Sequence, residues 1–261
     1  MSRIILLRAD MEETESRLTS CYSRLWEIER LPKVWKKGLV VKVFKKGDLH
    51  KCNNWRGVTL LPVSTKIFYR LLLERTKKGV DKKLPKEQAG FRPKRSTTEQ
   101  LFVLRNILEQ AKEWRAGLYT HFVEFEKAFD SAHRESLLNM MRIYGIPGKM
   151  VRAIAGIYVG FECAVVEGHV TSDWFMIKSG EKQGCIMSAF LILLCLEWVM
   201  RKAPTDKRRG IRWNFATVLK DLDFADDIAL LSSTFNDLHE KGGRLAEEAA
   251  RVGLKLNARK C

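Results

Sequence analysis

Residues 221–233 read DLDFADDIALLSS, and this stretch places two adjacent carboxylates, Asp226 and Asp227, inside an apolar run. Neighbouring anions repel each other and lose hydration among core residues, so they persist where something positive meets them. Two apolar, strand-like runs flank the pair and are separated by a very short polar step. This pattern predicts a β-hairpin that carries both carboxylates at its tip.

An acidic hairpin tip has two interpretations. On the dipeptide alone, a solvated turn is favoured, because Asp side chains bond locally in turns. A hard divalent cation such as Mg²⁺ instead takes oxygen ligands, usually one or two carboxylates plus substrate phosphates. A second acidic strand end, FVEFEKAFD at residues 122–130, carries Glu124 among apolar residues. Two such ends favour the metal interpretation, because carboxylates from different strands can clamp two ions during phosphoryl transfer.

Charge and composition point to a globular protein with a polyanionic partner. The 261-residue chain is 46% hydrophobic, enough for one sizeable core or two packed lobes. Its formal net charge of +16 favours nucleic acid over an anionic membrane surface as the partner. Six cysteines show no C-x-x-C pair, so neither a disulfide framework nor a structural zinc site is indicated.

The most apolar segment, IMSAFLILLCLEWVM at residues 186–200, is interrupted by Ser188 and Glu197. It is also shorter than the roughly 20 residues that a bilayer span needs, so it predicts a buried core helix. The first residues carry no cleavage pattern of a secretory signal. We therefore expect an intracellular protein, nuclear or cytoplasmic or both, without a membrane span.

Hydrophobic periodicity predicts mixed α and β structure. A basic hairpin is expected from strand Leu39–Phe44 and the WRGVTLLPV segment after it, and the Ser96/Glu99 capping box opens a long helix. Further helices are expected over Glu12–Arg30, from His133 to Gly145, from Pro147, from Ile186 and over Leu238–Val252. Further strands are expected over Leu118–Phe125, Phe161–Val166, Trp174–Lys178, Val218–Phe224 and Ile228–Leu231.

Short motifs follow one another in order from Leu31 to Lys260. They read LPKVWKKG, VFKKGD, NNWRGVTLLPVSTKI, EQAGFRPKRSTTEQ, FVEFEKAFDSAHRESL, YGIP, KQGCIMSAFL, GIRW, FADDIALL and GLKLNARK. A lone F-A-D-D carries little weight, whereas the ordered set is very specific. On these motifs, the chain resembles the reverse transcriptase domain of non-LTR (LINE-type) retrotransposons.

The resemblance implies an α+β right-hand polymerase fold with fingers and palm, in which an antiparallel palm sheet packs on helices. We expect a helical lead-in over residues 1–30, a fingers region over 31–118 and a palm region over 119–261. The family continues past GLKLNARK into a primer-grip segment and a thumb. The expectation is therefore an incomplete domain with the thumb absent.

The resemblance also implies the site. Glu124, Asp226 and Asp227 match the carboxylates that hold two Mg²⁺ ions, with Mn²⁺ as a possible substitute. Phe129 matches the bulky residue placed against the ribose 2′-hydroxyl; without the family, a core aromatic is the favoured interpretation. The implied nucleotide-binding set comprises Phe125, Phe129, Gln183, Gly184, Arg56, Lys45, Lys46 and Lys260. The lysines and Arg56 match groups near the triphosphate and pyrophosphate, although charge runs are usually solvated faces.

The implied activity is RNA-directed DNA polymerase (nucleotidyltransferase), with an RNA template, a DNA primer and deoxynucleoside triphosphates as partners. One departure bears on activity: Glu124 stands where the family usually has Asp. The extra methylene shifts the carboxylate by about 1 Å, and such misplacement can cost roughly 100-fold in rate. The alternative hypothesis is therefore a catalytically impaired remnant that binds nucleic acid. A third hypothesis is a metal-dependent nuclease or other phosphotransferase.

Basic clusters support salt-dependent binding to a phosphate backbone in any of these cases. They comprise Lys33, Lys36, Lys37, Lys42, Lys45 and Lys46 in the first hairpin, and Lys82, Lys83, Lys86, Arg92, Lys94 and Arg95 further on.

Overall fold

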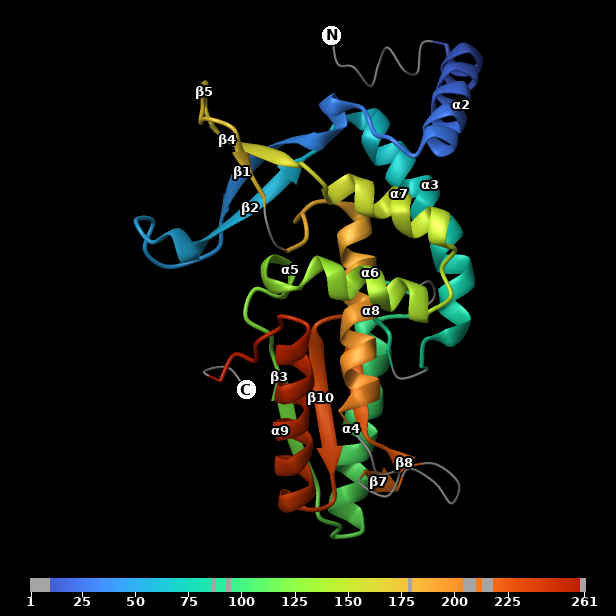
Figure 1. Ribbon diagram of the computed structural model, residues 1–261. Helices are drawn as coiled ribbons and strands as arrows, with labels where there is room; N and C mark the ends of the chain where they lie inside the picture. Colours follow the sequence, from blue (N-terminus) through green and yellow to red (C-terminus); the bar gives the residue numbers. More distant parts are fainter. Residues whose placement is uncertain are drawn as a thin grey trace. The chain divides into compact units, whose positions relative to one another are not determined.

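The computed structural model describes residues 10–85, 88–92, 95–177, 180–203, 210–212 and 218–258. The chain forms two compact units (Figure 1). Unit 1 contains Met1–Gly79, Met141–Lys178 and Lys182–Ser188; unit 2 contains Val80–Met140, Ser179–Glu181 and Ala189–Cys261. Both units mix helices and strands, as the periodicity predicts.

Unit 1 begins with helix α2 (Met11–Ile28), which confirms the expected N-terminal helix. The Asp10 side chain caps it by accepting a hydrogen bond from the Glu13 amide. The helix ends two residues earlier than expected, because Glu29 takes a left-handed conformation. On its buried side, Tyr22 packs against the rings of Trp35 and Phe68, with centroids 6.0 and 5.5 Å away. Phe68 belongs to α3 (Val63–Val80), so an aromatic cluster anchors both helices.

Unit 1 also contains a sheet. Strands β1 (Lys37–Phe44) and β2 (Trp55–Leu60) pair antiparallel and confirm the basic hairpin. Strand β4 (Glu162–Glu167) pairs parallel with β1, a connection that the sequence pattern does not indicate. The remaining elements of this unit are η1 (Lys33–Lys36), η2 (Cys52–Asn54), α7 (Gly148–Tyr158), β5 (Val170–Thr171) and β6 (Phe175–Met176).

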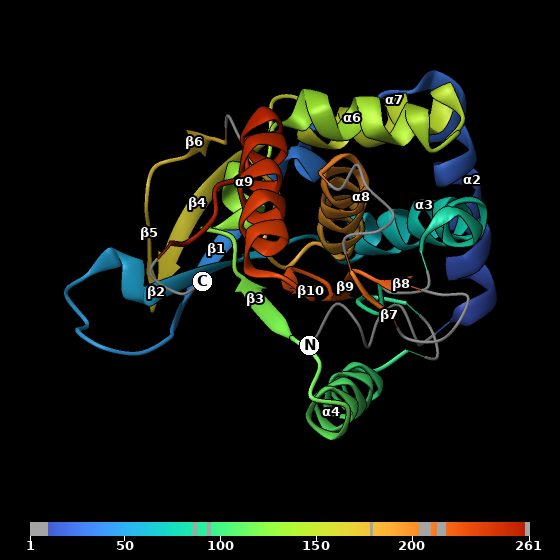
Figure 2. The ribbon, with the colours of Figure 1, turned by 90° about the horizontal axis from the view of Figure 1, so that it is seen from below.

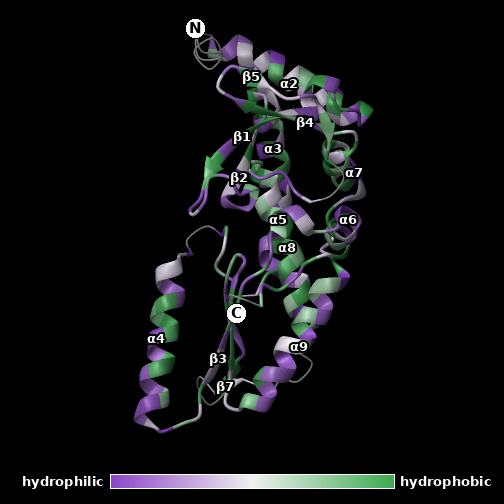
Figure 3. Ribbon diagram, turned by 90° about the vertical axis from the view of Figure 1, so that its left-hand side faces the viewer, coloured by the Kyte–Doolittle hydropathy of each residue, from purple (hydrophilic) through white to green (hydrophobic). Residues whose placement is uncertain are grey.

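Unit 2 is built around a three-stranded antiparallel sheet. The central strand β10 (Asp227–Ser232) lies between β3 (Tyr119–Val123) and β9 (Asp221–Phe224). Helices α4 (Thr97–Glu113) and α9 (Phe235–Arg251) lie on opposite sides of this sheet (Figures 2 and 3). Ile107 of α4 packs with Leu222, Ala229 and Leu231 on one face.

Side-chain caps begin both of these helices. The Ser96 hydroxyl accepts from the Glu99 amide at 3.3 Å, which confirms the predicted capping box at the start of α4. Thr234 caps α9 in the same way through the Asp237 amide at 3.2 Å. The smaller elements are η3 (Asp81–Lys83), α5 (Ala128–Ser131), α6 (Arg134–Ile143), β7 (Ile211–Arg212) and β8 (Val218–Leu219).

Helix α8 (Ile186–Lys202) is the apolar segment that the sequence singles out. Each residue from Leu191 to Leu196 is at most 1% exposed, so the middle of the helix is buried on all sides, which explains why it is apolar on all sides. The prediction of a core helix is confirmed. No helix in the described part of the chain is long and apolar enough to cross a membrane.

We expect the unit 2 core to be sensitive to truncation at β10. Leu231 is 0% exposed, so Leu231→Ala should lower the free energy of unfolding by about 2–5 kcal/mol through lost burial and a residual cavity. Leu108 on α4 is 52% exposed, and Leu108→Ala should change it by less than about 0.5 kcal/mol. Urea denaturation followed by circular dichroism measures both; equal losses would contradict the described packing.

Candidate active site

The two aspartates of FADD lie where the sequence places them. Asp227 pairs with Phe224 across β9 and β10, so Ala225 and Asp226 form a two-residue hairpin turn. Asp226 lies in the turn, and Asp227 is the exposed first residue of β10. Ala225 has φ +59°, a left-handed conformation that such turns need but that a non-glycine residue adopts at a cost. The predicted hairpin is confirmed.

The strand register brings Glu124 to this turn. β3 ends with Val123 paired to Ile228, so the same register, continued by one residue, places Glu124 across from Asp227. Residues opposite each other in an antiparallel pair project from the same face. The backbone of Glu124 is fixed from the other side, because its carbonyl accepts a hydrogen bond from the Asn257 amide at 2.8 Å. Segment GLKLN thus lies beside the acidic strand end.

Glu124 and Asp227 line a pocket of about 230 Å³ in unit 2. Its other walls are apolar side chains of the sheet, including Phe122 and Phe224, and residues of α4, including Thr97 and Leu101. The carboxylates therefore meet a partly apolar space on the α4 side of the sheet. Two carboxylates among apolar pocket walls suit a ligand with both positive charge and apolar surface, or a metal ion that brings its own ligands.

The acidic residues partly meet the requirements of a divalent cation. Two carboxylates from neighbouring strands are the usual protein contribution to a Mg²⁺ site whose remaining ligands are water and phosphate oxygens. Among the described residues, no group of three or more His, Cys, Asp or Glu side chains is arranged to hold a metal ion. The convergence of Glu124, Asp226 and Asp227 on shared ions is thus not seen in this structure, and their assignment as metal ligands stays a prediction.

The two phenylalanines of the second acidic segment differ in exposure. Phe125 is 5% exposed and forms an isolated bridge with Leu256, so it contributes to the core of unit 2. Phe129 lies in α5 and is half-buried. Its carbonyl accepts a hydrogen bond from the Glu181 amide, which ties the start of the EKQG segment to α5. Their roles at a nucleotide stay predictions.

Burial also raises the pKa of a thiol that interacts with Glu181. In α8, burial raises the pKa of Cys195 to about 12, and the charge of Glu181 contributes a smaller part of the rise. Glu181 itself is 5% exposed. The Cys195 thiol therefore stays protonated and unreactive at neutral pH.

The KQG loop is tied to unit 1. The Thr59 amide of β2 donates to the Gln183 carbonyl at 2.7 Å, and Gly184 has φ +96°. The buried Lys182 ammonium donates to the Ile157 carbonyl at 2.8 Å, at the end of α7, and lies 3.2 Å from the centroid of the Phe161 ring. The Gln183 contact therefore holds the loop on β2, and the Lys182 side chain holds it to the end of α7.

The basic side chains that are predicted to bind a nucleotide or a phosphate backbone differ in what they contact. Lys45, Lys46 and Arg56 are exposed on the hairpin of unit 1. Lys42 is paired with Glu167 at 2.5 Å, and Lys37 with Glu162 at 3.8 Å while also lying 4.5 Å over the Trp174 ring. The predicted residues Lys260, Lys86 and Lys94 lie outside the described residues.

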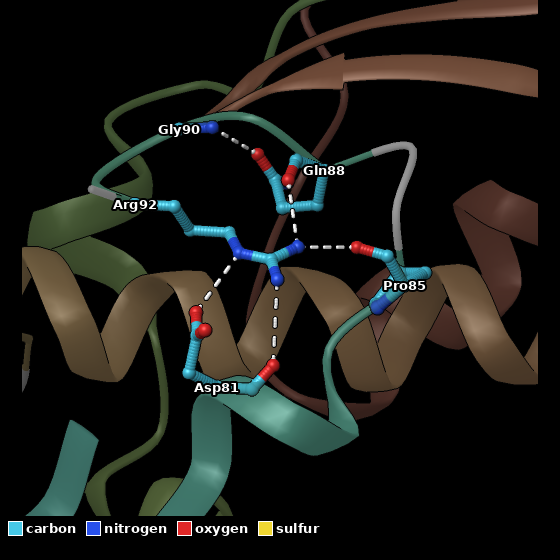
Figure 4. Close-up of polar contacts among 5 residues, drawn as sticks. All are labelled: Asp81, Pro85, Gln88, Gly90 and Arg92. Atoms are coloured by element: carbon cyan, nitrogen blue, oxygen red, sulfur yellow. Dashed lines mark hydrogen bonds and ion pairs between the residues drawn. The ribbon is translucent and has the colours of Figure 1, made fainter. Parts of the chain in front are cut away.

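Arg92 has a local structural role, which corrects its expected place among the phosphate-neutralising groups. Its guanidinium donates to the Asp81 carboxylate at 3.0 Å and to the carbonyls of Pro85 and Gln88 (Figure 4). The Arg92 side chain is only 12% exposed. A guanidinium whose donors are bonded to its own loop stabilises that loop rather than binding phosphate.

Sequence reasoning also missed Gln88, which the motif EQAGFRPKRSTTEQ contains without an assigned role. Gln88 is 1% exposed, and its side-chain oxygen accepts a hydrogen bond from the Ala225 amide in the FADD turn at 3.0 Å. A glutamine in a polar segment carries no periodicity signal, so nothing in the sequence alone pointed to this contact.

Comparison with known proteins decides the family. Residues 43–261 match the family described as "Reverse transcriptase (RNA-dependent DNA polymerase)". The chain belongs to the reverse transcriptase family. Within it, the chain is related to enzymes of non-LTR retrotransposons, and the resemblance seen in the motifs is confirmed.

Two curated relatives illustrate the relationship. The chain is 32% identical over 260 residues to the RNA-directed DNA polymerase from mobile element jockey of Drosophila melanogaster, covering 94% of this chain and 27% of that protein. It is 28% identical over 239 residues to the transposon TX1 uncharacterized 149 kDa protein of Xenopus laevis, covering 87% and 17%. The chain thus spans less than a third of the length of either relative.

Solved structures share the fold. A telomerase from Candida tropicalis, in complex with a TWJ fragment of telomeric RNA, superposes with a TM-score of 0.63 at 12% identity. The match covers 95% of this chain and 44% of that one. Because the two sequences are only 12% identical, the superposition shows a shared mixed α+β fold and nothing about function.

Gly184 gives a direct test of the KQG loop. A Cβ there would lie 2.9 Å from the Thr59 carbonyl oxygen, in a backbone conformation that side chains disfavour. Gly184→Ala should therefore lower the free energy of unfolding by about 1–3 kcal/mol. Gly79, on helix α3 of the same unit, has open space, so Gly79→Ala should instead stabilise by up to about 1 kcal/mol. Chemical denaturation distinguishes the two, and a neutral Gly184→Ala would contradict the loop geometry.

Proposed function

We propose that this chain is the RNA-directed DNA polymerase domain of a non-LTR retrotransposon, which adds deoxynucleotides to the 3′ end of a primer. The observation that carries the proposal is the register of β3 and β10, which sets Glu124 opposite Asp227 beside the turn that holds Asp226. Membership of the reverse transcriptase family supports the reaction class.

The acidic residues would hold divalent cations, Mg²⁺ or Mn²⁺, through Glu124, Asp226 and Asp227. When bound, a pair of such ions supplies charge stabilisation to the attacking and leaving oxygens of an in-line phosphoryl transfer. The protein's own part is positional: the sheet fixes two carboxylates on one face, and the hairpin turn presents the third. Fixed geometry of this kind is the main protein contribution to phosphoryl transfer.

Other residues would bind the nucleotide and the strands. In this proposal, Phe129 limits space at the ribose 2′ position, and Phe125 belongs to the same nucleotide-binding set. Gln183 and Gly184 line the nucleotide pocket, and Arg56, Lys45 and Lys46 meet the triphosphate. Lys260 would approach the leaving pyrophosphate. An RNA template and a DNA primer are the proposed partners, in keeping with the net charge of +16.

A second candidate function is binding of nucleic acid without catalysis. It is favoured by Glu124, whose side chain is one methylene longer than the family's usual Asp. A carboxylate displaced by about 1 Å can lose roughly 100-fold in rate while the basic surface still binds phosphates. The right-hand arrangement of fingers (31–118) and palm (119–261) is proposed for either function.

Primer extension on an RNA template with Mg²⁺ separates the two candidates. We expect wild type to extend a primer and Glu124→Asp to extend it up to about 100-fold faster, because the shorter side chain restores the usual ligand geometry. Asp226→Asn should abolish extension, whereas Asp173→Asn, in an exposed loop of unit 1, should leave it unchanged.

If neither wild type nor Glu124→Asp extends a primer and both still bind template, the polymerase proposal fails and the binding function stands. Undiminished extension by Asp226→Asn would refute the role of the turn. Template degradation without nucleotide incorporation would favour a nuclease instead.

Binding to single-stranded RNA should weaken steeply with salt. Lys45 and Lys46 are exposed on the hairpin, so the double variant Lys45→Gln/Lys46→Gln should reduce the slope of log affinity against log salt by about 1.4. Lys112→Gln, on the exposed side of α4, is the matched control and should leave the slope unaltered. Fluorescence anisotropy at several salt concentrations measures the slope; an identical slope in both variants would rule out a phosphate-binding hairpin.

A further inference from the structure

Gln88 begins a short segment that runs against the end of β9. It forms an isolated parallel bridge with Asp223, and the next residue, Ala89, donates its amide hydrogen to the Asp223 carbonyl at 2.9 Å. Gln88 and Asp223 are 1% and 2% exposed. The segment therefore continues the sheet of unit 2 beside β9, just before the FADD turn.

The Gln88 side chain reaches into that turn. Its oxygen accepts two hydrogen bonds, from the Gly90 amide at 2.7 Å and from the Ala225 amide at 3.0 Å. Its amide nitrogen faces the Ala225 carbonyl at 3.5 Å. One buried side chain thus contacts both backbone polar groups of the residue that precedes Asp226.

Ala225 is the residue in this turn that needs such support. Its φ of +59° lies in the left-handed region, which a residue with a Cβ adopts only when its surroundings impose it. Glycine would relieve the strain but would leave the turn freer to move. An alanine clamped by a buried amide gives one defined direction to the two carboxylates that follow.

Gly90 allows the segment to approach this closely. A Cβ on Gly90 would lie 2.6 Å from the Ala225 Cα and 2.8 Å from its Cβ, so only glycine fits here without moving the turn. The Gly90 backbone itself is fixed by the Gln88 oxygen. Close approach and hydrogen bonding therefore act on the same residue of the hairpin.

Arg92 fixes the clamp from its outer side (Figure 4). Its guanidinium donates to the Gln88 carbonyl at 3.1 Å and to the Asp81 carboxylate at 3.0 Å. The backbone of Gln88 is thus bonded to Arg92, while its side chain is bonded to the turn. This places a continuous chain of polar contacts from η3 to the acidic hairpin.

We infer that Gln88 is a positioning residue for the polymerase reaction, holding the Ala225–Asp226 turn so that the carboxylates of Asp226 and Asp227 keep one geometry. The inference rests on the proposed function. In a purely structural role, the buried glutamine would be only a satisfied polar group. A positioning role requires more: when Gln88 is replaced, the turn must loosen and turnover must fall, while the fold and the substrate affinity persist.

Amide hydrogen exchange of Ala225, followed by NMR on ¹⁵N-alanine-labelled protein, reports on the clamp without any catalysis. Gln88→Met keeps the side-chain length but removes the acceptor, so the Ala225 amide should exchange roughly fivefold to tenfold faster. Gln110→Met on α4 is the matched control and should leave that rate unchanged. Unchanged protection of Ala225 in folded Gln88→Met would overturn the inference.

Steady-state primer extension tests the effect on the carboxylates. Gln88→Met should lower kcat by about 100-fold, with KM for the nucleotide within about threefold of wild type, as expected when groups are misplaced by about 1 Å. Gly90→Ala, which pushes on the turn and keeps the hydrogen-bonding groups, should lower kcat in the same way. Gly243→Ala on α9 has open space around its Cβ and should leave kcat unaltered.

The outcomes separate the inference from the function on which it rests. If neither wild type nor Glu124→Asp extends a primer, the proposed function fails, whereas the Ala225 exchange rate still decides whether Gln88 holds the turn. An active wild type with undiminished kcat in both Gln88→Met and Gly90→Ala overturns the positioning role.

Discussion

The antiparallel pairing of β3 with β10 sets the geometry of the candidate site. It pairs Val123 with Ile228, so the same register, continued by one residue, sets Glu124, which follows Val123, across from Asp227, which precedes Ile228, on a shared face. A slip of one residue would turn one carboxylate to the opposite face of the sheet. The register is secured by burial, since Val123, Ile228 and Leu231 are all at most 3% exposed.

Two anions on neighbouring strands repel each other, and the surrounding contacts oppose that repulsion. The backbone of Glu124 is bonded to Asn257, and the Ala225 turn is bonded to Gln88. The contact between Gln88 and Ala225 is buried, and a hydrogen bond is stronger in the low dielectric of a protein interior than in water. The fold therefore pre-forms an acidic strand end, and divalent cations with nucleotide phosphates are the ligands that complete its charge balance in our proposal.

Patterns among neighbouring residues predicted the structural features that depend only on local interactions. The hairpin around Asp226, the Ser96 cap of α4 and the burial of α8 follow from alternation, capping and a continuous apolar run, and the structure has all three. The parallel pairing of β1 with β4 joins strands more than 100 residues apart, and nothing in either strand encodes that partner. Helix α3 is not among the elements that the hydrophobic pattern predicts, although the VSTKI motif lies at its start.

The candidate site divides in the same way. Glu124, Asp226 and Asp227 could be named because acidic residues inside apolar strands are unusual. Gln88 could not, since its role depends on the contact with Ala225, which is 137 positions away in the chain. Arg92 was misread for a related reason: its charge is visible in the sequence, but the carbonyls of Pro85 and Gln88 that engage it are not.

The most direct test of the acidic site is paramagnetic broadening by Mn²⁺, a probe that needs no turnover. With primer, template and a non-hydrolysable nucleotide present, Mn²⁺ should selectively broaden the amide signals of Val123, Ala225 and Ile228, and should leave Leu238, in the first turn of α9, sharp. The broadening should vanish in Asp227→Asn. If Mn²⁺ leaves the three signals sharp, or broadens them equally in Asp227→Asn, then Glu124 and the FADD turn do not form the cation site.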